Sequence, residues 1–210
     1  IDSAAYERNR EAADTENRFV FPCKNTGKVC LFTSAGQLHT IKVMDIPFGK
    51  FRDKGMPIDN ISNYDSKKEE IVYMTSQTQL NLRRVAFVTA QSMLKLVDGG
   101  EFDVSKRTVA ATRLGEDDSV ISVMPIEEQS SIVLQTREGY FLKFPLEEIP
   151  EKKKAALGVR GMKLGARDAV ENAYYIQNTV ETAIEYKGKT VILNNLKPGK
   201  RDSKGTKIRV

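Results

Sequence analysis

Apolar strand patterns separated by tight turns recur along the chain. Four segments share an apolar, β-branched run, a two-residue turn and a second apolar run: residues 29–38, 85–94, 132–141 and, more weakly, 180–189. Such a pattern is typical of a β-hairpin. The turn requires positive φ, which glycine supplies in three copies, at Gly36, Gly139 and Gly188, whereas Ser92 takes that place in the second copy. The sequence therefore predicts four hairpins.

A second signature, with basic residues and mostly with glycine, follows each hairpin. A proline-marked bend comes first, at Pro47 in one copy and at Pro145 and Pro150 in another. The basic signature occupies residues 51–58, 105–110, 158–164 and 202–208, and an acidic turn with another apolar strand comes next, most clearly at residues 115–124. Four strands in about 48 residues form a sheet that cannot bury both faces alone and must pack on its neighbours.

The repeat defines the fold class and the domain limits. We expect an all-β, propeller-like disc of four-stranded blades with at least four blades, in repeats near residues 28–75, 84–124, 131–175 and 180–210. Residues 17–210 then form this domain, and residues 1–16 a leader or a partial first blade. Residues 3–16 have some helical character, but too few apolar residues for a buried stripe, so a solvated leader is favoured over a helix.

Charge is distributed unevenly along the chain. The formal net charge is +5, from 33 Lys and Arg against 28 Asp and Glu, yet residues 1–150 are slightly acidic and the last sixty residues are strongly basic. This asymmetry indicates an anionic partner, with nucleic acid ahead of a membrane surface. No apolar stretch approaches a membrane span, and the first residues lack a secretion-signal pattern, so we expect a cytosolic chain.

Residues able to support catalysis are few. His39 is the only histidine, and its strand-like context predicts an outward-facing, idle imidazole. Cys23 and Cys30 lack C-x-x-C spacing and a nearby histidine, so we expect inert, partly buried thiols, although a disulfide is left open. Tyr174 and Tyr175 lie in an apolar strand and are expected to serve packing. An independent enzyme is therefore the least favoured class.

Taken together, these motifs resemble a known family. They are the hairpin with its Thr-x-x-Gly turn, Phe144-Pro145 after it, the string from Gly158 to Leu164 followed by Asp168-Ala169-Val170, and residues 42–47. With these motifs the chain resembles the carboxy-terminal domain of the A subunit of bacterial type IIA DNA topoisomerases, namely DNA gyrase and topoisomerase IV. The resemblance covers most of residues 17–210.

The resemblance implies a β-pinwheel whose basic rim binds and bends double-stranded DNA, with no membrane contact. It also implies that catalysis, ATP and magnesium belong to other parts of the enzyme, which are the ATPase B subunit together with the N-terminal breakage-reunion domain of the same polypeptide. No cofactor is then expected in this chain, which would work at the nucleoid in the bacterial cytoplasm. Gyrases carry a Q-R-R-G-G-K-G box, which does not occur in the 210 residues. A topoisomerase IV-like role and a divergent gyrase-like role both stay open.

Basic residues in the connecting segments are the candidate DNA contacts. Lys and Arg at a rim neutralise phosphates and release counterions without reading bases. The predicted set is Lys106, Arg107, Arg113, Arg160, Lys163, Lys200, Arg201, Lys204 and Lys207, followed by Arg83 and Arg84. The run Lys152-Lys153-Lys154 has the simpler interpretation of an exposed linker. The alternative function is a propeller-type interaction module that binds an acidic partner protein.

Overall fold

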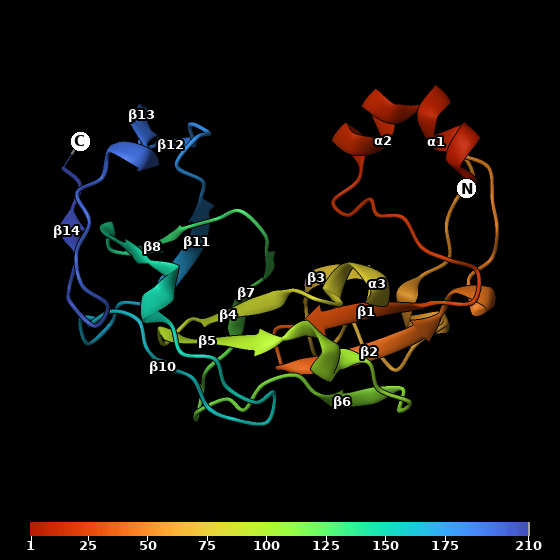
Figure 1. Ribbon diagram of the computed structural model, residues 1–210, viewed down its shortest axis with the longest axis horizontal. Helices are drawn as coiled ribbons and strands as arrows, with labels where there is room; N and C mark the ends of the chain where they lie inside the picture. The colour runs from red at the N-terminus through yellow and green to blue at the C-terminus, as the bar shows by residue number, and fades with distance from the viewer. Residues whose placement is uncertain (210) are drawn as a thin grey trace.

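Antiparallel sheets follow one another along an arc. The computed structural model describes residues 1–209 and contains three four-stranded sheets and one two-stranded sheet (Figure 1). The predicted all-β, propeller-like class is confirmed, but the fourth predicted blade contains two strands in place of four.

Each complete sheet contains one hairpin and two outer strands. The first sheet has the order β3-β1-β2-β6, with β1 (Lys28–Thr33), β2 (Gln37–Lys42), β3 (Ile71–Ser76) and β6 (Thr108–Ala110). The second has the order β10-β5-β4-β7, with β4 (Arg84–Thr89), β5 (Met93–Asp98), β7 (Val120–Ile126) and β10 (Val159–Arg160). The third has the order β11-β8-β9-β14, with β8 (Ser131–Thr136), β9 (Tyr140–Pro145), β11 (Val170–Ile176) and β14 (Thr206–Lys207). The fourth hairpin is β12 (Ala183–Tyr186) with β13 (Lys189–Ile192).

The turns of the hairpins have the predicted backbone. Gly36, Gly139 and Gly188 have φ of 73°, 89° and 77°. Ser92 adopts the same left-handed conformation with φ of 66°, although it carries a side chain. Its hydroxyl oxygen is buried and accepts the N–H of Met162 at 2.8 Å, so this turn is also tied to a distant segment of the chain.

The fourth strand of every complete sheet comes from the following repeat. The repeat pattern assigned four strands to each repeat, whereas β6, β10 and β14 pair with β2, β5 and β9 of the preceding repeat. We call residues 105–114, 152–164 and 199–209, which contain these strands, the exchange segments. Gly158 permits the close pairing, because a Cβ there would lie 2.6 Å from the carbonyl oxygen of Leu94.

The hydrophobic core lies between neighbouring sheets. Phe32 of the first sheet meets Phe87 and Phe102 of the second repeat, with ring centroids 5.8 and 5.0 Å apart. A second cluster joins strands β4 and β5 to β8 and β9, and a third joins β8 and β9 to the fourth hairpin. Nearly every residue of β1, β4 and β8 is buried, and β4 and β8 have a core cluster on each side of their sheet.

Short helical turns complete the connections. The 3-10 helices are η1 (Val43–Asp45), η2 (Ile58–Asn60), η3 (Gly99–Phe102), η4 (Leu146–Glu148) and η5 (Leu193–Asn195), and one short α-helix, α3 (Gln77–Leu80), precedes β4. Four of the 3-10 helices, η1, η3, η4 and η5, directly follow the second strand of a hairpin, which is where the sequence predicted a bend.

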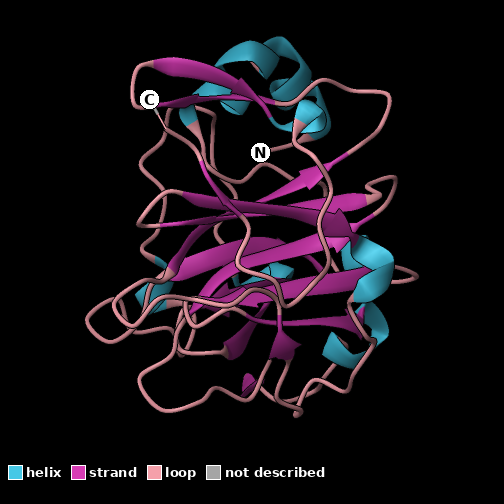
Figure 2. Cartoon of the chain, turned by 90° about the vertical axis from the view of Figure 1, so that its left-hand side faces the viewer, coloured by secondary structure: helices cyan, strands magenta, loops and turns pink. Residues whose placement is uncertain are grey.

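The preference for a leader without a helix was wrong. Residues 3–16 form α1 (Ser3–Arg8) and α2 (Arg10–Glu16), which lie at the upper end of the molecule in the side view of Figure 2. The Asp2 carboxylate caps α1 by accepting the N–H of Ala5 at 2.7 Å. Only Ala13 is buried in the two helices, so the segment forms helices without the apolar stripe that would have predicted them.

Candidate nucleic-acid interface

The three exchange segments form one continuous edge of the molecule. Arg113 N donates to the carbonyl oxygen of Ala156 (3.4 Å), which joins the first segment to the second. Lys163 N donates to the carbonyl oxygen of Ser203 (2.9 Å), which joins the second to the third. In Figure 1, β6, β10 and β14 lie on the outer side of the arc, whereas β3, β7 and β11 lie on its inner side and contact one another in turn.

This edge is strongly basic. The first two exchange segments contain no acidic residue, and the third contains Asp202 alone. Nine of the eleven predicted residues lie on the edge: Lys106, Arg107, Arg113, Arg160, Lys163, Lys200, Arg201, Lys204 and Lys207. Eight of the nine are exposed and Arg201 is partly buried, so a partner can reach the cations along the whole edge.

The single acidic residue of the edge is held by an arginine. Asp202 accepts from Arg160 Nε and, at 3.0 Å, from Arg160 Nη2. This contact lowers the pKa of Asp202 and raises that of Arg160. The side chain of Arg201 donates to the carbonyl oxygen of Arg160 at 2.8 Å. Arg160 and Arg201 are therefore placed side by side where the second and third segments meet.

Aromatic and backbone contacts order other cations of the edge. Lys204 Nζ and Lys207 Nζ lie 4.8 and 5.5 Å from the centre of the Tyr140 ring, within the range of cation–π attraction. In the first segment, the carbonyl oxygens of Lys106 and Arg107 accept from the Thr40 hydroxyl (3.0 Å) and the Thr40 N–H (2.9 Å). The backbone of the first segment is thus fixed while the side chains of Lys106 and Arg107 face solvent.

Arg83 and Arg84 lie outside the exchange segments. Arg83 forms an ion pair with Glu127 and donates to the carbonyl oxygen of Gln79 at 3.0 Å. Arg84 begins β4, where its backbone is in register with Asp98. The structure therefore does not bring these two predicted residues together with the other nine.

The lysine run is not a loose linker. Lys152, Lys153 and Lys154 begin the second exchange segment, and three carbonyl oxygens of residues 153–156 surround the amine of Lys95. Neither feature was predicted from the sequence. Lys153-Lys154 stands 47 residues before Lys200-Arg201, and this repeat offset is the signal that could have identified the run.

The expectation for His39 was wrong. The imidazole is buried, and Nε2 lies 2.9 Å from the Glu69 carboxylate while Nδ1 lies 2.8 Å from the Thr108 hydroxyl. Thr108 belongs to β6, so His39 links the first hairpin to an exchange strand. This is a structural arrangement, because the ring is covered by its neighbours and faces no open site.

The other candidate catalytic groups also serve the structure. The Tyr174 hydroxyl donates to Gln135 Oε1 (2.7 Å) and the Tyr175 hydroxyl meets Ser122 Oγ (2.8 Å), and burial raises the pKa of both phenols. Cys30 is buried, and burial raises the pKa of its thiol to about 12. Cys23 is exposed, contrary to the expected partial burial, and the two thiols are unbonded.

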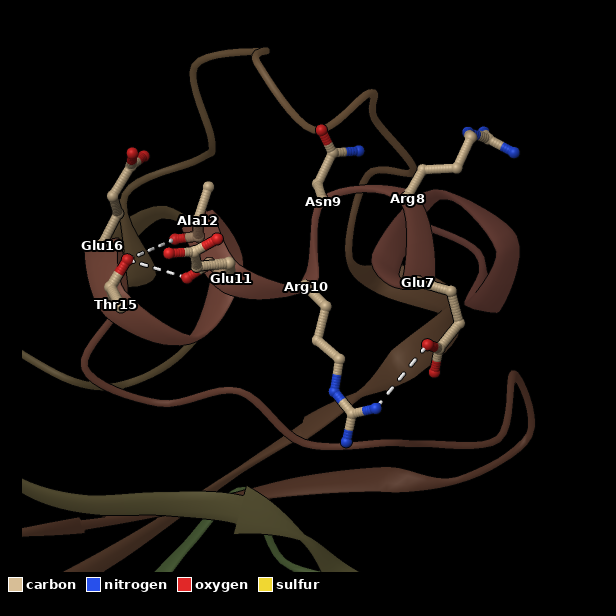
Figure 3. Close-up of a pocket in the computed structure, with 8 residues that line it drawn as sticks. All are labelled: Glu7, Arg8, Asn9, Arg10, Glu11, Ala12, Thr15 and Glu16. Carbon is tan, nitrogen blue, oxygen red and sulfur yellow. Dashed lines mark hydrogen bonds and ion pairs between the residues drawn. The ribbon is translucent and has the colours of Figure 1, made fainter.

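Across residues 1–209 the structure contains no group of three His, Cys, Asp or Glu side chains arranged to hold a metal ion. A hollow beside α1 and α2 is lined by exposed polar groups (Figure 3). There Arg10 pairs with Glu7 at 3.9 Å, and the Thr15 hydroxyl donates to the carbonyl oxygen of Glu11 at 2.8 Å. These contacts stabilise the helices and provide no activated nucleophile. In the same described part of the chain, no helix has the length and apolar character to cross a membrane.

Comparison with known proteins gives a consistent family. A family profile described as "DNA gyrase C-terminal domain, beta-propeller" matches residues 83–127 and 130–177, which are the second and third hairpins with the strands that follow them. The A subunit of DNA gyrase from Lawsonia intracellularis is 30% identical over 174 residues, covering 82% of this chain and 21% of that protein. The chain spans about a fifth of the length of the curated relatives it matches.

Solved structures share the fold. The crystal structure of the C-terminal domain of DNA topoisomerase IV superposes with a TM-score of 0.81 at 23% identity, covering 99% of this chain and 68% of that one. The structure of the DNA gyrase A C-terminal domain superposes with a TM-score of 0.65 at 18% identity, covering 88% of this chain and 60% of that one.

Proposed function

The chain belongs to the family of DNA gyrase C-terminal β-propeller domains, and from this membership we propose that it binds and bends double-stranded DNA through phosphate contacts along its basic edge. The observation that supports the proposal is the continuity of the three exchange segments. Their backbones are hydrogen-bonded to one another, and nearly all of their charged side chains are basic. Phosphate contacts hold the protein on the duplex without selecting a sequence.

A curved row of cations suits bending better than one isolated patch. Bending a duplex through 40 to 90° costs on the order of 1 to 6 kcal/mol, which several phosphate contacts offset together. The exchange segments follow the outer side of the arc in Figure 1, so a duplex that follows them would curve around the protein. The chain would thereby present a DNA segment for strand passage.

The remainder of the enzyme would supply the chemistry. We propose that the chain acts as part of the A subunit of an ATP-dependent type IIA topoisomerase, beside the N-terminal breakage-reunion domain and the ATPase B subunit. The catalytic tyrosine, magnesium and ATP would belong to those parts, and the assembly would act on the nucleoid in the cytoplasm.

A salt titration tests this proposal directly. The 210-residue chain is mixed with random-sequence duplexes of increasing length, and the binding constant is measured from low to high salt. We expect a steep fall of log K with log salt concentration, because each neutralised phosphate contributes a slope of about −0.9, and tighter binding to longer duplexes. A flat slope, or equal affinity for an acidic polypeptide, would contradict the proposal.

A further inference from the structure

A buried lysine holds the loop at the start of the second exchange segment. Lys95 of β5 is only 1% exposed, and its Nζ donates to the carbonyl oxygens of Lys153 (3.1 Å), Lys154 (2.7 Å) and Ala156 (2.9 Å). An ammonium group has three N–H donors, and all three are satisfied here. Because a buried cation without such partners would be costly, the loop cannot leave Lys95 without a penalty.

A carboxylate fixes the same loop from its other side. Glu101 of η3 accepts the N–H of Lys154 at 3.1 Å through Oε2, and its Oε1 lies 3.8 Å from Lys153 Nζ. With the carbonyl oxygens turned inward, the side chain of Lys153 is 86% exposed. The loop therefore has an ordered backbone and a lysine head group in solvent.

The next repeat builds the same loop. Glu148, 47 residues after Glu101, accepts the N–H of Arg201, which is 47 residues after Lys154, at 2.7 Å. Lys152 N donates to the Leu96 carbonyl oxygen, and Gly199 N donates to that of Lys143, both at 2.8 Å. Lys153 and Lys154 thus occupy the positions of Lys200 and Arg201. In the first repeat, Val109 pairs with Leu38 as Val159 pairs with Leu94, and by this register Asp103 and Val104 take the positions of Lys153 and Lys154.

Resting on the proposed DNA binding, we propose that Lys153 and Lys154 form a phosphate-binding site on the second blade and that Lys95 is the residue that positions it. The ligand is the phosphodiester backbone of duplex DNA. The site repeats the geometry of Lys200 and Arg201, and the hydrogen bond from Lys163 N to Ser203 O joins the segments that carry the two sites. Two fixed pairs of cations on neighbouring blades would hold a duplex at two places along the arc.

Charge removal at the loop tests the site. Lys153→Gln with Lys154→Gln is compared with the control Lys67→Gln with Lys68→Gln, which removes the same charge from exposed positions outside the exchange segments. We expect the loop variant to bind duplex DNA several-fold more weakly and its salt slope to shrink by about 1.8, at roughly 0.9 for each lost contact. The control is expected to keep the slope.

The outcomes separate this inference from the proposed function. If the unsubstituted chain shows no salt-dependent DNA binding, the proposed function fails. If the unsubstituted chain binds but the loop variant matches its control, the second-blade site is refuted while the proposed function stands.

The role of Lys95 is tested through a double-mutant cycle. Lys95→Met removes the donors, so we expect weaker DNA binding and faster tryptic cleavage after residues 152–154. Because Lys95 acts through the loop lysines, the same substitution should cause no further loss of affinity in the Lys153→Gln and Lys154→Gln background. An equal loss in both backgrounds would overturn the positioning role.

If Lys95→Met fails to fold, hydrogen exchange of the Lys154 amide is measured in the unsubstituted chain. We expect slow exchange. Exchange at the rate of an unstructured peptide would contradict a fixed loop.

Discussion

Two buried titratable residues occupy the same position in successive hairpins. His39 and Lys95 are the third residues of β2 and β5, and both reach segments that come later in the chain, Thr108 for His39 and Ala156 for Lys95. Strand alternation suggested that His39 faces solvent, because one face of a sheet is usually free. That face is covered here by other segments of the chain, with Tyr64, Glu69 and Thr108 around His39 and residues 153–156 around Lys95. Polar residues at this position therefore bind segments that come later in the sequence.

The pH dependence of stability should identify the buried ammonium. Burial lowers the pKa of Lys95 to about 8, from an ordinary value of 10.5 for the free side chain. The negative charge of Glu101 raises the pKa of Lys95, and the positive charge of Lys152 lowers it. Between pH 8 and pH 10.5 the unfolded chain holds a proton that the folded chain has released, so the free energy of unfolding rises with pH.

We therefore expect the stability of the unsubstituted chain, relative to Lys95→Met, to increase from pH 7 to pH 10 by on the order of 1 to 3 kcal/mol. Denaturant titrations at several pH values measure the difference. Lys153→Met is the matched control, because it replaces a lysine whose side chain is exposed rather than buried. If the stability difference between the unsubstituted chain and Lys95→Met stayed constant with pH, the lowered pKa of Lys95 would be contradicted.

At the scale of elements, the exchange strands are the least predictable part of the fold. The hairpins could be predicted because both strands and their turn are local in sequence. A two-residue strand such as β10 has the same local pattern whether it joins its own repeat or the preceding one, so its partner depends on packing. Helices α1 and α2 were missed because neither has the apolar stripe that predicts a helix, although α1 is capped by the Asp2 carboxylate.

A single methyl group should disturb the exchange strand. In Gly158→Ala the new Cβ would lie 2.6 Å from the carbonyl oxygen of Leu94 and 2.8 Å from its nitrogen, both of which are backbone atoms in the paired strand. We expect a loss of about 1 to 3 kcal/mol in the free energy of unfolding and faster hydrogen exchange of the Gly161 amide, which donates to the Ser92 carbonyl oxygen. Gly55→Ala is the control, because nothing lies within 4 Å of its Cβ position. Equal stability of the two variants would show that β10 does not need this close approach.

At the scale of the whole molecule, strand exchange creates the basic edge. Each exchange segment reaches back to the outer side of the preceding sheet, so basic residues that are distant in sequence are joined into one row (Figure 1). The sequence predicted nine of these residues from their charge and their place in the repeat. It could not predict their continuity, because the hydrogen bonds that join the segments link residues about 40 positions apart, such as Lys163 and Ser203.

Position along this edge, rather than net charge, should control DNA binding. One variant replaces four lysines of the edge by Gln, at Lys106, Lys163, Lys204 and Lys207, and its control replaces four exposed lysines elsewhere, at Lys24, Lys67, Lys68 and Lys189. Both variants lose the same charge. We expect the edge variant to reduce the salt slope by up to about 3.6 and to weaken binding to unrelated duplex sequences equally, since phosphate contacts do not read bases. Sequence-selective loss would indicate base contacts, and equal weakening in the control would show that the overall positive field, not the exchange segments, attracts the DNA.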